Sequence, residues 1–206
     1  MSDLETADAW ERMWAPYDEA TYSQVLRWLS PDDIVLDIGA GDLRLAGRMA
    51  RKASQVYAVE LNGDLESPAT QHLPSSNLTI IWGDAYQVPF PTGITVAVLL
   101  MRHCQGFSAL LNKLQTIGCQ RLITNARWRA GVEMIDLQRS PTPYPVATLG
   151  WYACRCGATG FVEGSPEKLN VQIESAVQEV IDCPACESPN RPGRLSSRST
   201  KTTSGK

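Results

Sequence analysis

Residues 34–44 constrain the fold of this chain more than any other stretch, because a buried strand, a glycine turn and a helix start follow one another there. The stretch reads I-V-L-D-I-G-A-G-D-L-R. Residues 34–36 form the short continuous apolar run expected of a strand that is covered on both faces. Gly39 and Gly41 then allow a sharp turn and a close approach of a ligand to the backbone. An apolar-periodic helix is expected to follow, so the stretch is typical of the start of a nucleotide-binding βαβ unit.

Carboxylates stand at the ends of the next two predicted strands. Residues 55–59 form the second strand and lead into Glu60, nineteen residues after Gly41. That spacing places a carboxylate beside the glycine turn, where it can accept hydrogen bonds from ribose hydroxyls. Residues 78–82 form the third strand, and Asp84 follows it closely. We expect Asp84 to lie where it can accept a hydrogen bond from an adenine amino group.

These motifs resemble those of class I S-adenosylmethionine-dependent methyltransferases, and above all the rRNA adenine dimethyltransferase group. The similarity rests on D-I-G-A-G, A-V-E-L-N and G-D-A-Y-Q-V-P-F, which occur in this order within about residues 30–127. It implies an α/β, Rossmann-like fold with a doubly wound, mainly parallel sheet, and S-adenosyl-L-methionine as cofactor. The cofactor-binding residues that it implies are Asp37, Gly39, Gly41, Glu60, Leu61, Asp84 and Ala85.

The resemblance also implies which part of the cofactor each of these residues binds. Asp37 and the glycine turn would hold the methionine end, Glu60 the ribose, and Asp84 with Ala85 the adenine. The alternative for each carboxylate is a turn or a helix cap, which Asp favours in any case. Three carboxylates at three consecutive strand ends make a joint coincidence a poor explanation.

Two departures from the family pattern limit what the resemblance implies. No glycine stands at Leu43 or Arg44, where the third glycine of a dinucleotide site would fall, which argues against NAD. The predicted fourth strand, residues 94–101, runs into L-L-M-R-H-C-Q-G-F, without the Asn/Asp-Pro-Pro-Tyr-like motif of amino-methylating enzymes. Adenine N6 dimethylation therefore does not carry over, and the substrate stays open between RNA and protein.

Arg102, His103 and Cys104 follow the predicted fourth strand, at the end of the sheet where doubly wound folds bind ligands, so we expect them nearest the transferable methyl. We expect His103 to act as a general base on the acceptor, because its pKa range suits that role. A helix-start or packing role for His103 is about as well supported. Arg102 either orients an anionic substrate or pairs with Asp42 or Glu60.

A second group of residues consists of two short-spaced cysteine pairs, separated by 26 residues. Thiol pairs on tight turns can converge on one tetrahedral Zn²⁺ with four sulfurs, and a site closed in this way is structural. The pattern resembles a zinc ribbon, although its first pair is C-x-C, and four unrelated thiols are the alternative. The expected ligands are Cys154, Cys156, Cys183 and Cys186. Cys104 and Cys119, unpaired in sequence, are interpreted as buried apolar residues.

The chain is expected to divide into three parts. Residues 1–139 form the S-adenosylmethionine-binding methyltransferase domain, residues 146–187 the zinc-ribbon-like segment, and residues 188–206 a disordered basic tail. The first part includes two N-terminal helices, and Tyr17 between them either covers the ligand or, as we favour, anchors packing. The elements expected elsewhere are helices over 2–14, 19–29 and 107–114 and strands over 120–125, 131–137, 146–153 and 160–163. Residues 164–180 admit either a helix or a strand.

Composition narrows the class of protein. The 206 residues are 43% hydrophobic and 20% charged, as in ordinary globular proteins, and the net charge of −3 gives no overall nucleic-acid signature. The start lacks the pattern of a signal peptide, and no apolar run has the length of a membrane span. We expect a cytoplasmic enzyme without membrane contacts, whose cysteines are thiols or metal ligands. The alternative is a catalytically inactive, methyltransferase-like zinc-binding module that binds RNA or protein.

Overall fold

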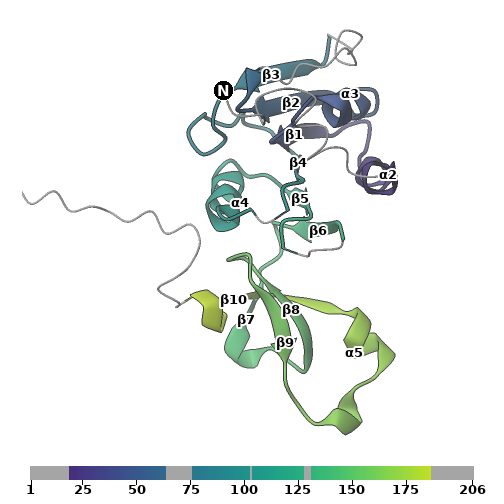
Figure 1. Ribbon diagram of the computed structural model, residues 1–206, viewed down its shortest axis with the longest axis vertical. Coiled ribbons are helices and arrows are strands. Elements are labelled where there is room, and N and C mark those ends of the chain that lie inside the picture. The colour runs from purple at the N-terminus through teal and green to yellow at the C-terminus, as the bar shows by residue number, and fades with distance from the viewer. Residues whose placement is uncertain (1–18, 64–75, 103, 128–130, 187–206) are drawn as a thin grey trace, which may run out of the picture.

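The computed structural model describes residues 19–63, 76–102, 104–127 and 131–186 (Figure 1). The predictions made for the helix over residues 2–14, for Tyr17, for His103 and for the tail therefore lie outside the described residues. Within the described part, no helix has the length and apolar character needed to cross a membrane.

A six-stranded, mainly parallel sheet forms the larger part of the molecule. Its strand order is β3-β2-β1-β4-β5-β6, and only β6 runs antiparallel to its neighbour. The strands are β1 (Ile34–Ile38), β2 (Gln55–Glu60), β3 (Leu78–Trp82), β4 (Val96–Leu99), β5 (Arg121–Thr124) and β6 (Glu133–Asp136). The predicted doubly wound α/β fold is confirmed.

Helices cover both faces of this sheet, as Figure 1 shows. On one face, α2 (Glu19–Arg27) and α3 (Arg44–Ala50) enclose a core with Val35 and its neighbours; on the other, α4 (Phe107–Thr116) packs against residues such as Leu36. Successive strand residues point to opposite faces, so a strand buried on both sides must be apolar throughout. This explains the uninterrupted apolar runs in β1 and β4.

A second, four-stranded sheet follows, with the order β7-β10-β8-β9. Its strands are β7 (Thr142–Pro143), β8 (Gly150–Cys154), β9 (Thr159–Val162) and β10 (Val177–Ile181). Short helices η3 (Tyr144–Val146), η4 (Pro166–Lys168), α5 (Val171–Ser175) and η5 (Pro184–Cys186) connect or follow them. Because β10 lies parallel to β8, both strands end at the same edge, and the two cysteine pairs meet there.

The structure corrects two predictions from the sequence and answers one question that the sequence left open. The fourth strand is shorter than residues 94–101, since Leu100 and Met101 leave the sheet and line a pocket. Residues 164–180 contain both a helix and a strand: the Asn170 side chain caps α5 at the amides of Gln172 and Ile173, and β10 pairs with β8. Cys119 is buried as expected, but Cys104 is half-buried at the pocket.

Arg127 joins the two sheets. Its guanidinium bonds both oxygens of Glu133, at 2.8 and 2.6 Å, and approaches Glu179 to 2.8 Å. It also donates to the carbonyl of Cys154 at 3.3 Å. Burial alone lowers the pKa of Arg127, but hydrogen bonds and charge pairing with the two glutamates outweigh this and raise it. A permanently charged residue thus ties the larger sheet to the first cysteine pair.

A second contact between the sheets lies at Gly157, just after the first cysteine pair. Gly157 has φ +100°, and a Cβ there would come within 3.4 Å of the Phe107 ring. Phe107 is buried and begins α4. The cysteine turn therefore packs against the helix whose preceding loop lines the pocket.

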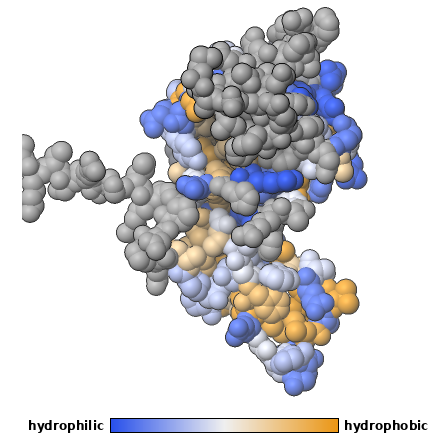
Figure 2. Space-filling model, viewed as in Figure 1, coloured by the Kyte–Doolittle hydropathy of each residue, from blue (hydrophilic) through white to orange (hydrophobic). Residues whose placement is uncertain are grey.

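The smaller sheet carries an apolar surface, visible as orange atoms in the lower part of Figure 2. The exposed large apolar residues of this region are Val146, Trp151, Leu169, Val171 and Val177. Such side chains offer no charge to a phosphate backbone.

Candidate functional site

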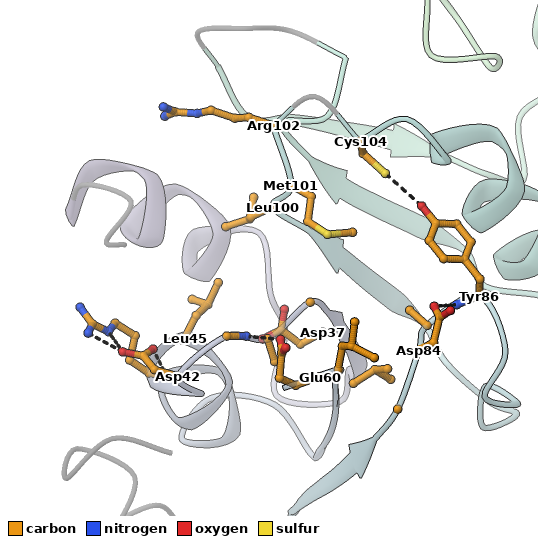
Figure 3. A pocket seen from close by; sticks show the side chains of 18 of the residues that line it. Asp37, Asp42, Leu45, Glu60, Asp84, Tyr86, Leu100, Met101, Arg102 and Cys104 are labelled. Atoms are coloured by element: carbon orange, nitrogen blue, oxygen red, sulfur yellow. Dashed lines mark hydrogen bonds and ion pairs between the residues drawn. The ribbon is translucent and has the colours of Figure 1, made fainter. Parts of the chain in front are cut away.

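The main pocket lies beyond the carboxyl ends of β1 to β4, where doubly wound sheets bind ligands (Figure 3). Its volume is about 660 Å³. All seven residues predicted from the sequence to bind a cofactor line its wall: Asp37, Gly39, Gly41, Glu60, Leu61, Asp84 and Ala85. Their roles toward a cofactor remain predictions.

The glycine turn is bonded to the end of β2. The amides of Gly39 and Ala40 donate to the carbonyl of Val59 at 2.9 and 3.1 Å, and Gly41 donates to Glu60 Oε2 at 2.8 Å. Gly39 and Gly41 have φ of 73° and 57°, which side chains adopt only under strain. The second Glu60 oxygen accepts from the Asn62 amide at 2.9 Å. Glu60 is 8% exposed, so its position is fixed before any ligand arrives.

Asp37 is a buried carboxylate that faces the same pocket. Only 3% of the residue is exposed, and its Oδ2 has no hydrogen-bond partner among the described residues. Burial, and then the charge of Glu60, raise the pKa of Asp37 to about 7. An orphaned buried acceptor of this kind indicates a ligand that brings a donor or a positive charge.

The raised pKa makes the stability of the ligand-free protein depend on pH. Between the ordinary value of 3.8 and about 7, folded Asp37 binds more protons than it does in the unfolded chain. This contribution to the free energy of unfolding is therefore present at low pH and is lost as pH rises toward 7, by up to about 1.4 kcal/mol per pH unit. We expect Asp37→Asn to remove this slope. Urea unfolding of both proteins from pH 4 to 8 measures it, and parallel pH profiles would contradict the assignment.

The segment after β3 is held in place by contacts to α4. Asp84 Oδ1 accepts from the amide of Tyr86 at 2.8 Å. Lys113, on α4, donates to the Ala85 carbonyl at 2.7 Å and also to that of Val88. These bonds fix the wall that was predicted to hold an adenine.

Tyr86 and Cys104 meet across the pocket mouth, as Figure 3 shows. The Tyr86 hydroxyl lies 3.7 Å from Cys104 Sγ. A Cβ at Gly106 would lie 2.1 Å from that hydroxyl, so the approach requires a glycine there. Burial and the Cys104 contact raise the pKa of Tyr86 to about 12, which keeps the hydroxyl protonated at neutral pH.

Of the two residues predicted to act on the acceptor, the structure describes Arg102 but not His103. Arg102 lines the pocket and is exposed, and in Figure 3 its side chain extends away from Cys104. Asp42, one partner considered for Arg102, is paired with Arg44, whose Nε lies 2.5 Å from Asp42 Oδ2. His103 lies outside the described residues, so its role as a base stays a prediction.

The four cysteines of the two pairs form a compact cluster at the edge of the smaller sheet. Their sulfurs all lie within 4.8 Å of one another. Cys154 Sγ is 3.6 Å from Cys186 Sγ, and Cys156 Sγ is 3.6 Å from Cys183 Sγ. Hydrogen bonding from the Cys156 thiol lowers the pKa of Cys154 well below its ordinary value. The predicted convergence of the pairs is confirmed.

Several residues of the site had no clear signal in the sequence. Tyr86 and Cys104 are adjacent to predicted strand ends, and that position was the one available clue. Lys113 and Arg127 act through contacts across the fold. Such contacts leave no local pattern.

A model of the family described as ribosomal RNA adenine dimethylase matches residues 18–126, just over half of the chain. The "probable ribosomal RNA small subunit methyltransferase A" of Methanosarcina mazei is 48% identical over 64 residues, which cover 31% of this chain and 24% of that protein. The "ribosomal RNA small subunit methyltransferase A" of Clostridium botulinum is 32% identical over 76 residues, covering 35% and 28%. The chain thus spans about a quarter of the length of the curated relatives it matches.

Among solved structures, a dimethyladenosine transferase from Plasmodium falciparum aligns with 20% identity and a TM-score of 0.45. The alignment covers 52% of this chain and 41% of that chain. This likeness is too weak to support a conclusion about function. Neither the family match nor the relatives support the alternative of a module without catalysis.

Proposed function

Because the chain belongs to the ribosomal RNA adenine dimethylase family, we propose that it transfers a methyl group from S-adenosylmethionine to RNA. The observation that carries this proposal is the pocket in which Asp37, Glu60 and Asp84 stand at three adjacent strand ends. The RNA substrate follows from the family, whose relatives are named for ribosomal RNA.

The two buried carboxylates suit different parts of the cofactor, Asp37 the methionine part and Glu60 the ribose. Asp37 Oδ2 can accept from an ammonium group, which removes the cost of an unpartnered buried acceptor. Glu60 uses one lone pair of each oxygen on the backbone and retains others for ribose hydroxyls. The bound cofactor supplies a methyl on a sulfonium, and the protein positions it against the acceptor.

The four-cysteine cluster supports a structural Zn²⁺ as second cofactor. Tetrahedral zinc with Zn–S bonds of 2.3 Å requires sulfurs about 3.8 Å apart. Three of the six Sγ–Sγ distances, at 3.6 to 3.8 Å, agree with this, and all six are within 4.8 Å. With four thiolates the site is closed, so the metal would stabilise the smaller sheet and take no part in methyl transfer.

Glu60→Ala is expected to weaken S-adenosylmethionine binding by about 1.5–3 kcal/mol, the range for losing charge-assisted hydrogen bonds. Glu60→Gln should fall between parent and alanine variant, since its amide nitrogen must face one of the two backbone amides that Glu60 now accepts from. Titration calorimetry measures the affinities. Glu19→Ala is the matched control, because Glu19 is an exposed carboxylate paired with Arg48. Equal affinity in Glu60→Ala and Glu19→Ala would remove Glu60 from the site.

Methyl transfer itself is tested with S-adenosylmethionine that carries a tritiated methyl group. Purified chain is incubated with ribosomal RNA, with other RNA and with protein fractions, and label is counted in each. We expect label in RNA, and roughly seven- to eightyfold less of it with the Glu60→Ala variant at a cofactor concentration near the parent's dissociation constant, which follows from the expected loss of affinity. Label in protein alone would contradict the RNA substrate, and no label in any fraction would contradict the enzyme.

A further inference from the structure

Basic side chains gather along the line where α2 and α3 meet. Residues 19–27 and 42–52, which contain the two helices, carry five basic and two acidic side chains, although the whole chain has a net charge of −3. A local excess of positive charge on an acidic chain indicates a surface that attracts an anion. We call the five basic residues, Arg27, Arg44, Arg48, Arg51 and Lys52, the basic seam.

The fold of α3 places part of the basic seam in one row. α3 buries its apolar side chains in a core of the larger sheet. Arg44, Arg48 and Arg51 recur at intervals of four and three residues, so they share the outer face of the helix. From Arg44 to Arg51 the helix rises about 10 Å, which is enough for about three successive phosphates of a nucleic-acid strand.

Contacts between the helices continue this row onto α2. Arg48 pairs with Glu19 at 2.6 Å, and Lys52 donates to the carbonyl of Leu26. A carbonyl does not cancel the charge of an ammonium group, so Lys52 stays a cation beside Arg27, which follows Leu26. Figure 1 shows the two helices on one face of the larger sheet, apart from the smaller sheet.

Most charges of the basic seam are available to a ligand. Arg27 and Arg51 are exposed, and neither forms an ion pair with another described residue. The Glu19 partner of Arg48 is 70% exposed, so this pair is weak and can be exchanged for a phosphate. Arginine suits phosphate because its planar fork bonds two oxygens at once.

The basic seam begins at the main pocket. Arg44 lines the pocket wall, as do Tyr22 of α2 and the predicted cofactor residue Asp37. An RNA strand that lies along the basic seam therefore reaches the pocket in which the methyl donor is proposed to bind. Chemistry on a base requires that base to leave its stack, and fixing the neighbouring phosphates supports this.

The smaller sheet carries the opposite charge. Residues 142–186 contain five acidic and two basic side chains. Glu163, Glu167 and Glu174 are exposed there, whereas the Arg155 side chain is mostly buried and lies 3.6 Å from Glu179. A phosphate backbone is repelled by such a surface, so the basic seam is the better match for RNA.

We propose that the basic seam binds the phosphate backbone of the RNA acceptor and leads the strand to the pocket. This inference rests on the proposed function, from which the RNA substrate is taken. Phosphate contacts fix the position of a strand but carry no sequence information, so the choice of base is left to the pocket. Arg27, Arg48 and Arg51 are therefore positioning residues.

Salt-dependent RNA binding tests the basic seam with two double variants that lose the same charge. The seam variant combines Arg27→Gln with Arg51→Gln. The matched control combines Arg139→Gln with Lys168→Gln, two exposed cations outside the basic seam. Fluorescence anisotropy of a fluorescein-labelled single-stranded RNA of mixed sequence is measured over a range of potassium chloride concentrations. The basic residues of 188–206 are the same in both variants, so their contribution cancels.

Counterion release sets the size of the expected effect. Each phosphate contact to a single strand contributes about −0.7 to the slope of log affinity against log salt, or about fivefold in affinity at about 0.1 M salt. The seam variant should therefore bind about 25-fold more weakly at that concentration, with a slope shallower by about 1.4. The control should stay close to the parent. In the tritium assay the seam variant should raise KM for ribosomal RNA and keep kcat and the affinity for S-adenosylmethionine, because neither of its substituted side chains lines the pocket.

The outcomes separate this inference from the proposed function. If the seam variant binds RNA as the control does while the parent labels RNA, the surface is refuted and the methyltransferase stands. If the parent binds RNA, loses that binding in the seam variant and labels no RNA, the surface is supported and the proposed function fails. A parent that binds no RNA, or that binds vesicles containing phosphatidylserine and not RNA, contradicts both.

Discussion

Replacing Cys183 with serine is expected to strip the protein of metal and to unfold the smaller sheet. Cys183 is buried, and its sulfur lies 3.6 Å from Cys156 Sγ and 3.8 Å from Cys186 Sγ. Structural zinc contributes roughly 10–16 kcal/mol of apparent binding free energy in small domains, and losing one of four thiolates forfeits much of it. The smaller sheet has few other buried side chains, among them Val180. It should therefore depend on the metal.

Elemental analysis and amide hydrogen exchange measure this result. The parent should contain close to one zinc per chain, and Cys183→Ser should contain far less and exchange rapidly over residues 142–186. The larger sheet should keep its protection, because its two cores contain none of these cysteines. Cys119→Ala should retain its zinc. A parent without zinc under reducing conditions, or a Cys183→Ser variant with full protection, would refute the metal site.

Arg127→Met is expected to destabilise the protein by about 3–5 kcal/mol, the cost of removing one partner from a buried charge network. The Arg127 side chain is 1% exposed, and its loss leaves Glu133 without the cation it pairs with and Glu179 with the longer 3.6 Å contact to Arg155. It also removes the bond to the Cys154 carbonyl. Thermal and urea denaturation give the change in free energy of unfolding.

Matched variants separate the charge network from a general effect of losing arginine. Arg48→Met breaks an ion pair whose Glu19 partner is 70% exposed, and should cost no more than about 1 kcal/mol. Combining Arg127→Met with Glu133→Gln and Glu179→Gln should recover part of the loss, because the stranded charges are then gone. An Arg127→Met protein as stable as Arg48→Met would contradict the role of Arg127 between the sheets.

The cofactor side of the pocket was predictable because its signals are local. The local sequence of residues 34–41 is enough to predict a strand followed by a turn, and Glu60 ends the next strand nineteen residues after Gly41. Parallel strands bring such ends together without further information. The four cysteines were predictable for a similar reason, since short spacings reveal each pair.

The rest depends on contacts between distant residues. β10 becomes a strand by pairing with β8, so residues 164–180 could not be assigned from their own pattern. Arg127 lies 27 residues from the Cys154 carbonyl that it bonds. Cys104 follows the predicted fourth strand at the ligand-binding end of the sheet, but it was interpreted as a core residue because an isolated apolar thiol usually is one. The structure places it half-buried at the pocket.

Titration calorimetry of the purified chain tests most directly whether the pocket at the ends of β1 to β4 binds S-adenosylmethionine. We expect saturable binding of one cofactor per chain, competed by S-adenosylhomocysteine and weakened in Glu60→Ala. Folded parent protein that gives no binding heat, and does not protect the pocket amides from exchange, at about 1 mM cofactor would contradict it, since that concentration is the upper end of usual enzyme affinities.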